Sequence, residues 1–230
     1  MNNLFVRKTV LATILGVTAG QAMAAGDSVD IKVSGEFIPG ACAVKFAGGG
    51  IVDYGTIKAE TILKDDFTML PVKNVRMDIE CDGPMKIAFH VVDMREGSGV
   101  ELGKIWDGRA RGNSGYLGLG KSGDKNIGSW AMWLDPVDLD TTEGDGVVDP
   151  IYTQGSPTES TKWNSSELLW LAQTGDWYQS WAARGSKTPL PVNYLMGKLY
   201  VQAGINKGSE LDLTKPITLD GMATIEVVYL

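Results

Sequence analysis

Residues 221–230 read GMATIEVVYL, and their pattern decides the fold class. Apolar side chains stand at every second position, namely at Ala223, Ile225, Val227 and Tyr229. Because successive side chains of a strand point to opposite faces, this alternation predicts a strand with one buried face.

A second alternating stretch, SVDIKVSGEF, covers residues 28–37. Its apolar face consists of Val29, Ile31, Val33, Gly35 and Phe37, and the residues between them are polar. Neither stretch has the Pro residue, bulge or extra charge that usually protects an exposed edge strand from aggregation. Two interpretations stay open. The stretches are ordinary edge strands of a complete sheet, or they take part in strand addition, in which one chain lends a strand to another.

Similar alternation recurs between these stretches, at residues 75–79, 86–91 and 199–203. Turn-forming sequences with Gly, Pro, Asp and Asn separate the segments, for example at residues 82–84 and 206–208. Short strands separated by such turns predict an all-β, antiparallel sandwich.

The central part of the chain is the exception. From Trp163 the sequence reads WNSSELLWLAQTG, where Asn164 and Glu167 match a helix-capping pair and Gly175 matches a helix end. We therefore expect one short helix there, over about residues 165–173.

Residues 1–24 have the features of a secretory signal peptide. Arg7 and Lys8 precede a short apolar run, and Ala22 and Ala24 form a cleavage site of small residues. The run is too short and too rich in Thr and Gly for a membrane-spanning helix. We expect export and a mature chain that starts at Ala25.

The charge of the chain argues against nucleic acid as a partner. The formal net charge is −7, and no basic cluster is present that could neutralise phosphates.

The chain has two cysteines, Cys42 and Cys81, and a single histidine, His90. In an oxidising compartment we expect the cysteines to form one disulfide. Two thiols alone do not complete a tetrahedral metal site, so no metal is expected. His90 lies in an alternating segment, which favours a strand residue over a base for a Cys nucleophile. We expect no enzyme activity and no cofactor.

Residues 115–122, GYLGLGKS, match the phosphate-loop pattern. A phosphate loop follows a buried strand and opens a helix. Here the preceding residues are polar, and a turn sequence, Gly123–Asp124, follows. We therefore interpret residues 116–119 as a strand that enters a turn, and we expect no nucleotide.

The acidic residues between Asp135 and Asp149 do not fit a calcium loop, because the Gly is misplaced and no closing Glu is present. A solvated loop is the expected alternative.

The chain has seven tryptophans, and Trp163, Trp170, Trp177 and Trp181 are spaced by 7, 7 and 4 residues. This spacing favours one apolar face packed in the core. The alternative is an exposed platform that stacks on sugar rings.

Several of these features together resemble the subunits of chaperone–usher fimbriae. They are Cys42 after an alternating segment, Cys81 at the end of a strand, VDYGTI at residues 52–57 and a last strand with the penultimate residue Tyr229. Residues 95–192 are longer than in ordinary major pilins and resemble a less characterised group of longer fimbria-like proteins, so the resemblance implies an enlarged central insertion that contains the short helix.

The resemblance implies an incomplete immunoglobulin-like domain that lacks its last strand. Residues 25–38 would be an N-terminal extension that donates a strand, with Val29, Ile31, Val33, Gly35 and Phe37 as its inward face. Residues 39–230 would form one pilin-like domain. The strand with Ala223, Ile225, Val227, Tyr229 and Leu230 would border the acceptor groove and bind a periplasmic chaperone.

The resemblance also implies an outer-membrane usher and neighbouring fimbrial subunits as partners, and a path through the periplasm to a fimbrium at the cell surface. Alternatives are a secreted carbohydrate-binding adhesin, or a minor tip or adaptor subunit, that binds a host glycan through exposed tryptophans. A secreted hydrolase is a third class, but no motif selects a pair of catalytic carboxylates.

Overall fold

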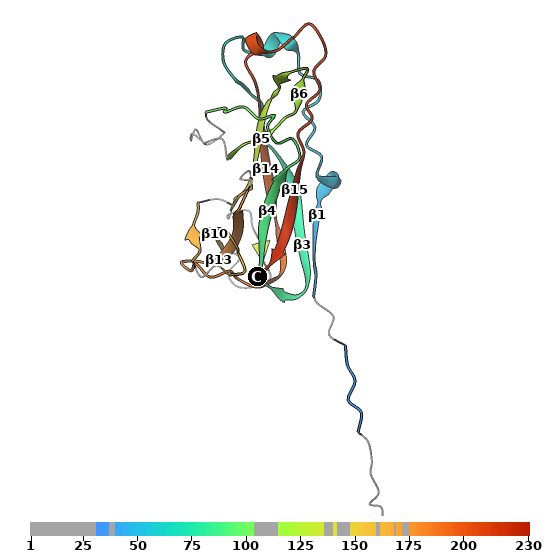
Figure 1. Ribbon diagram of the computed structural model, residues 1–230, viewed down its shortest axis with the longest axis vertical. Coiled ribbons are helices and arrows are strands. Elements are labelled where there is room, and N and C mark those ends of the chain that lie inside the picture. Colours follow the sequence, from blue (N-terminus) through green and yellow to red (C-terminus); the bar gives the residue numbers. More distant parts are fainter. Residues whose placement is uncertain are drawn as a thin grey trace, which may run out of the picture. The chain divides into compact units, whose positions relative to one another are not determined.

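The computed structural model describes residues 31–36, 40–103, 115–135, 140–141, 148–159, 162–167, 169–171 and 175–230. The chain divides into a smaller unit, Met1–Ile38, and a larger unit, Pro39–Leu230 (Figure 1). The expected signal peptide and two expected donor residues, Val29 and Phe37, lie outside the described residues.

The first sheet of the larger unit has the strand order β1-β3-β14-β8-β12. These strands are β1 (Cys42–Phe46), β3 (Lys73–Met85), β14 (Val192–Ile205), β8 (Gly128–Leu134) and β12 (Leu169–Trp170). Three short strands add to it: β2 (Thr68–Met69) and β9 (Asp140–Thr141) pair with β14, and β5 (Leu117–Gly118) pairs with β8. All of these pairs are antiparallel.

The second sheet has the order β11-β10-β13-β4-β15 and is also antiparallel. Its strands are β11 (Asn164–Ser165), β10 (Val148–Gln154), β13 (Trp177–Ala183), β4 (Ile87–Asp93) and β15 (Ala223–Tyr229). Strands β6 (Lys121–Ser122) and β7 (Lys125–Asn126) form a hairpin that belongs to neither of these sheets. The chain also has the 3-10 turns η1 (Ala47–Gly50), η2 (Ala59–Thr61) and η5 (Gly208–Glu210).

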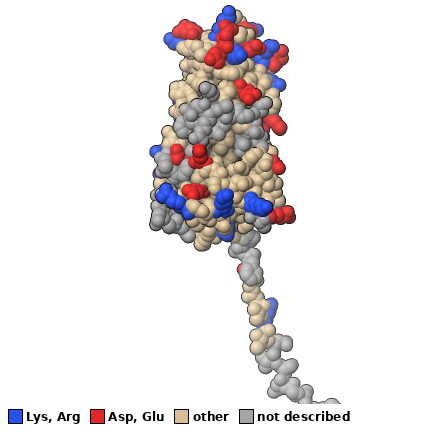
Figure 2. Space-filling model, turned by 90° about the vertical axis from the view of Figure 1, so that its left-hand side faces the viewer, with Lys and Arg blue, Asp and Glu red and all other residues tan. Residues whose placement is uncertain are grey.

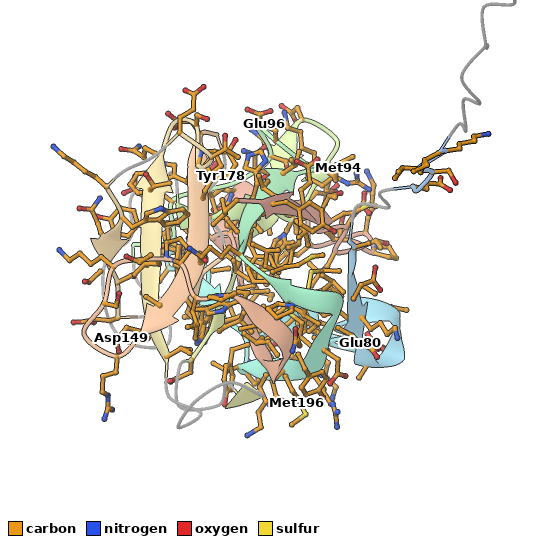
Figure 3. All side chains as sticks on the ribbon, turned by 90° about the horizontal axis from the view of Figure 1, so that it is seen from below. Glu80, Met94, Glu96, Asp149, Tyr178 and Met196 are labelled. Atoms are coloured by element: carbon orange, nitrogen blue, oxygen red, sulfur yellow. A yellow bond between two sulfur atoms is a disulfide. The ribbon has the colours of Figure 1, made fainter. Side chains whose placement is uncertain are left out.

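Both sheets contribute to one core (Figure 3). In the view from below, Glu80 and Met196 mark the first sheet and Asp149 and Tyr178 mark the second. The buried residues include Met77 and Ile79 of β3, Trp133 of β8, Phe89 of β4 and Trp181 of β13. The prediction of an all-β, antiparallel chain is therefore confirmed, and His90 is a strand residue of β4 as expected.

The expected helix over residues 165–173 is wrong where the structure describes this stretch. Ser165 belongs to β11 and pairs with β10, whereas Trp170 belongs to β12 and pairs with Trp133 of β8. The rings of Trp170 and Trp133 stack with their centroids 5.8 Å apart. Pairing with two different sheets outweighs the local helix signal, because helix propensity is weak against tertiary contacts.

The preference for tryptophans in the core is confirmed for three of the four. Trp163, Trp170 and Trp181 are buried, and Trp177 is half-buried. Their spacing comes from strands and turns and not from one helical face.

The phosphate-loop pattern lies in strand and turn structure, as expected. Leu117–Gly118 form β5, Lys121–Ser122 form β6, and the chain turns at Gly123 into β7. The residues after Ser122 form no helix that could bind phosphate at its N-terminus.

Charged side chains of both signs lie intermixed at both ends of the larger unit on the face shown in Figure 2. Within the described residues, no helix is long and apolar enough to cross a membrane.

Candidate functional site: an open edge between two sheets

The site is the space between β1 and β15. Strand β1 is the edge of the first sheet and β15 is the edge of the second. Across this space the Cys42 N–H donates a hydrogen bond to the Tyr229 hydroxyl at 2.8 Å, so the start of β1 lies beside the end of β15 (Figure 1). Among the described residues, each strand has a paired neighbour on one side only.

The main-chain groups of β15 show which residues face the open side. The Met94 N–H bonds to the Met222 carbonyl, and the Leu230 N–H bonds to the Lys86 carbonyl. Since hydrogen-bonded pairs alternate along an antiparallel ladder, even-numbered residues of β15 bond to β4. The N–H and C=O groups of the odd-numbered residues therefore point to the open edge; these residues are Ala223, Ile225, Val227 and Tyr229.

The same argument applies to β1. The Asp82 N–H bonds to the Ala41 carbonyl, so odd-numbered residues of β1 bond to β3. The main-chain groups of Cys42, Val44 and Phe46 point away from β3, as the bond from Cys42 to Tyr229 also requires. Both edges thus present alternate N–H and C=O groups that a further strand could use.

The side chains at these positions leave the core open. Ala223, Ile225 and Val227 pack against the core but are only half-buried, whereas Phe89, opposite Val227, is 1% exposed. On β1, Val44 and Phe46 are likewise half-buried opposite the buried Ile79 and Met77. Apolar surface that a further strand would bury therefore lies along both edges.

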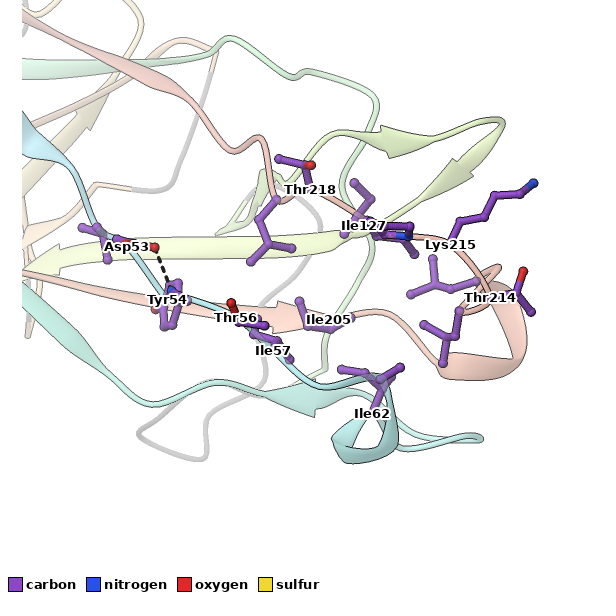
Figure 4. A pocket seen from close by; sticks show the side chains of 18 residues that line it. Asp53, Tyr54, Thr56, Ile57, Ile62, Ile127, Ile205, Thr214, Lys215 and Thr218 are labelled. Carbon is purple, nitrogen blue, oxygen red and sulfur yellow. Dashed lines mark hydrogen bonds between the residues drawn. The ribbon is translucent and has the colours of Figure 1, made fainter.

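A pocket of about 680 Å³ lies between the chain that follows β1 and the chain that leads into β15 (Figure 4). One wall is the chain that follows β1, with Tyr54, Ile57 and Ile62, and the other is the chain that leads into β15. Ile127 and Ile205 also line the pocket. Apolar groups of this kind predominate in pockets that bind apolar side chains or ligands.

Tyr54 fixes one wall of this pocket. Its hydroxyl donates to the Val201 carbonyl at 3.4 Å and accepts from the Ala203 N–H at 3.2 Å. Burial raises the pKa of Tyr54, and the bond from Ala203 acts in the opposite sense. The Lys73 ammonium lies 5.2 Å from the centre of the ring. These contacts hold the wall in place without the help of a ligand.

Strand β1 is fixed by a covalent bond. Cys42 and Cys81 form a disulfide, as expected, and they lie directly opposite each other in the ladder of β1 and β3.

Side chains before, within and after β15 hold this strand in place. Asp220 accepts hydrogen bonds from Arg95 Nε and Nη2 at 2.8 and 2.9 Å, and these bonds lower the pKa of Asp220. Within the strand, Glu226 Oε2 lies 3.1 Å from His90 Nδ1. Leu230 is half-buried and packs with Ala88, Ile151 and Ala182.

Of the residues expected to donate a strand, those that the structure describes belong to the smaller unit. Ile31 is 89% exposed and Val33 is 93% exposed. No atom comes within 4 Å of a Cβ built on Gly35. Residues 31–36 form no strand, because a single segment has no partner for its main-chain groups.

Two features of the site have no signal in the sequence. The pocket combines segments about 150 residues apart, and the bond from Cys42 to Tyr229 joins strands near opposite ends of the chain.

Among the described residues, no group of three or more His, Cys, Asp and Glu could hold a metal ion. Trp181 is buried and cannot stack on a sugar, whereas the half-buried Trp177 lies 5.3 Å from the ring of Tyr152.

The chain is thus an all-β protein whose two sheets leave one edge open. Residues 31–131 match the family described as "Protein of unknown function (DUF1120)". The chain is 30% identical over 220 residues to the "Uncharacterized protein YhcF" of Escherichia coli K12, which covers 88% of this chain and 90% of YhcF. It is 29% identical over 244 aligned positions to "Protein GltF" of the same organism, covering 96% of each. The chain belongs to the family of YhcF.

Proposed function

We propose that this protein is a structural subunit of a surface fimbria, assembled through the chaperone–usher pathway by donor-strand exchange. The observation that carries the proposal is the open edge between β1 and β15, where main-chain groups and half-buried side chains of both strands face the same space. In this proposal the larger unit is an immunoglobulin-like sandwich without its last strand.

A donor strand would complete both the ladder and the core. The apolar residues Val29, Ile31, Val33, Gly35 and Phe37 would face the core, and Gly35 would allow a close approach of the two main chains. Burial of a Val, Ile or Phe side chain contributes about 1.5–3 kcal/mol. Ile31 and Val33, which are almost fully exposed, therefore have a large gain available from insertion.

The same exposed edge would explain why a chaperone and an usher are needed for assembly. Before assembly, an exposed apolar edge promotes aggregation. A periplasmic chaperone would cover it with a strand of its own and would bind β15 together with the carboxylate of Leu230. The usher would then exchange this strand for the extension of a neighbouring subunit. The proposal places the protein first in the periplasm and then at the cell surface, without enzyme activity.

The test is a substitution on the inward face of the donor segment. We expect Ile31→Asp or Val33→Asp to abolish surface polymers, because a carboxylate would be buried in the completed core. Ser34→Asp, on the outward face of the same segment, is the matched control and should assemble normally. Immunoblots of sheared surface fractions from the native host give the readout. Normal polymers from the Ile31→Asp chain would rule out the donor assignment.

A carbohydrate-binding role has one supporting observation, the half-buried pair of Trp177 and Tyr152. A change in tryptophan fluorescence on addition of glycans that is absent from Trp177→Ala would favour an adhesin.

A further inference from the structure

We infer that one central segment of the chain is a strap that keeps a second copy of this chain from pairing with the far edges of the two sheets. The strap consists of residues 162–167 and 169–171. The far edges are the sides of β10 and β8 that face away from β15 and β1. The inference goes beyond the proposed function and rests on it only for its consequence for the fibre.

The strap supplies the last strand of both sheets. Its first part forms β11, which pairs with β10 at the far end of the second sheet. Its second part forms β12, which pairs with β8 at the far end of the first sheet. In both sheets the opposite end is the strand that borders the open edge, β15 or β1. A single segment therefore covers the far edges of both sheets.

Main-chain hydrogen bonds attach the strap to both sheets. The Ser166 N–H donates to the Pro150 carbonyl of β10, and the Leu171 N–H donates to the Met132 carbonyl of β8, each at 2.9 Å. Without the strap these carbonyls would lie on a strand edge. Unpaired main-chain groups along such an edge are a template for pairing with another chain. The strap thus occupies groups to which a second copy could otherwise bind.

Two buried tryptophans hold the strap against the sheets. Trp163 packs with Ile151 of β10 and Ala182 of β13. The ring of Trp170 is nearly parallel to that of Trp133 of β8, with an angle of 13° between the planes. A tryptophan side chain buries about 150–250 Å², so these two rings contribute much of the energy that keeps the strap in place.

Two polar side chains of the second sheet also bind the strap. The Thr153 hydroxyl donates to the Lys162 carbonyl at 3.2 Å. The amide of the buried Gln179 donates to the Trp170 carbonyl, so the second sheet also holds the part of the strap that pairs with the first. Release of the strap would take this partner from a buried donor, which is costly. The strap is therefore a fixed part of the fold.

The open edge lacks such a cover within the described part of the chain. Ile225 and Val227 of β15 are only half-buried, whereas Trp163 and Trp170 of the strap are buried. The chain thus protects its far edges with its own residues and leaves β1 and β15 exposed.

This difference determines how many copies one subunit can bind. In the proposed function each subunit accepts one strand and donates one, so the fibre does not branch. Release of the strap would expose β10 and β8 as well, and copies could then pair there without a donor segment. The strap restricts association to one edge.

Two proline variants test this role. The bond from Ser166 to Pro150 fixes which pairs of β11 and β10 are hydrogen-bonded. Since such pairs alternate along an antiparallel ladder, the Asn164 N–H bonds to β10, whereas the Ser165 N–H points away from it. Because proline has no N–H, Asn164→Pro removes a bond to β10 and its matched control, Ser165→Pro, removes none. Both side chains are exposed, so neither variant loses core packing.

Both substitutions are made in the full chain that also carries Ile31→Asp, which in the proposed function blocks association through the donor segment. Size-exclusion chromatography with light scattering at equal protein concentration gives the readout, and circular dichroism monitors the β-structure. We expect several-fold more dimers and larger species with Asn164→Pro than with Ser165→Pro, which should match Ile31→Asp alone. Equal association of the two folded proline variants would overturn the inference.

A covalent lock on the strap provides the second measurement. Ser165 lies directly opposite Ile151 of β10. Opposite residues that are not hydrogen-bonded to each other have Cα atoms about 4.5 Å apart, within the range that a disulfide bridges. Ser165→Cys with Ile151→Cys, added to the Asn164→Pro chain, should restore the monomer, and reduction should bring the association back. The reduced Asn164→Pro chain without the lock controls for reduction of the native disulfide.

The lock also covers the case in which Asn164→Pro alone has no β-structure. Reduction of the locked, folded chain should then produce association, and unfolding to monomers would overturn the inference. Association that persists with the lock closed would overturn it too, because the contacts would lie outside the far edges.

The inference and the proposed function fail in different ways. If the chain with Ile31→Asp alone still polymerises, the proposed function fails, and the comparison of Asn164→Pro with Ser165→Pro still tests the strap. If Ile31→Asp blocks polymers and both folded proline variants stay monomeric, the proposed function stands and the role of the strap is refuted.

Discussion

At the scale of single residues, a few side chains hold the last strand beside its open edge. Arg95 binds Asp220 through two hydrogen bonds just before β15 begins, and the Tyr229 hydroxyl bonds to Cys42 where β15 ends. Because β15 has a paired strand on one side only among the described residues, such contacts replace part of what a second neighbour would supply. The ion pair of Arg95 and Asp220 should therefore affect stability in a pH-dependent way.

We predict that Asp220→Asn lowers the melting temperature at pH 7 and that this difference disappears in acid. The bonds from Arg95 lower the pKa of Asp220 in the folded state below its usual 3.8. The stabilisation is therefore fully present above about pH 4 and is lost as the pH falls through the lowered pKa. Thermal unfolding of both proteins between pH 7 and pH 2 measures it.

The control for this experiment is Asp124→Asn. The Asp124 carboxylate lies in the β6–β7 turn, 3.8 Å from the Lys125 ammonium. Exposed pairs of this kind contribute little, so Asp124→Asn should behave like the wild type at every pH. A difference between Asp220→Asn and the wild type that persists unchanged at pH 2 would contradict the role of the charge.

At the scale of elements, the disulfide determines how firmly β1 stands at the edge of the first sheet. Strand β1 pairs with β3 over five residues, and the bond from Cys42 to Cys81 joins the first of these pairs. A strand so short, with a single neighbour, would fray without a covalent link. The open edge needs β1 as one of its two sides, so this link also supports the site.

We predict that the variant with both Cys42→Ala and Cys81→Ala loses about 4 kcal/mol of unfolding free energy, from the entropy of a loop of 39 residues. Urea denaturation of the monomeric protein gives the value. Reduction of the wild-type protein should produce the same loss. A loss below about 1 kcal/mol would mean that the ladder alone holds β1.

Local sequence patterns predict some of these elements and miss others. Alternation predicts β4 and β15, because Ile87, Phe89 and Val91 stand on one face of β4 and Ala223, Ile225 and Val227 stand on one face of β15. It misses that Ala88, on the other face of β4, is buried too. The prediction of a helix over residues 165–173 is wrong because the ring of Trp170 stacks on Trp133, a residue that no local sequence pattern connects with it. The pocket could not be predicted for the same reason, since its walls come from opposite ends of the chain.

At the scale of the whole molecule, the proposed function requires that residues 28–38 supplied in cis fill the open edge between β1 and β15. We predict that residues 28–38, attached after Leu230 in a version that lacks residues 25–37, give a monomer with a higher melting temperature than the deletion alone. Burial of Ile31 and Val33 contributes about 3–6 kcal/mol, which corresponds to a rise of roughly 6–24 °C in a chain of this size.

The length of the linker tests the direction of insertion in the same experiment. In the antiparallel direction the N-terminal end of the segment lies at the Tyr229 end of β15, so a linker of about four residues, the length of a hairpin loop, connects Leu230 to the segment. In the parallel direction the linker must run back along all of β15, roughly 20 Å, which four residues cannot span. Stabilisation by the short linker therefore supports antiparallel entry from the Tyr229 end. If only a linker of about twelve residues stabilises the monomer, the segment enters in the opposite direction. If neither linker raises the melting temperature, the edge between β1 and β15 accepts no strand.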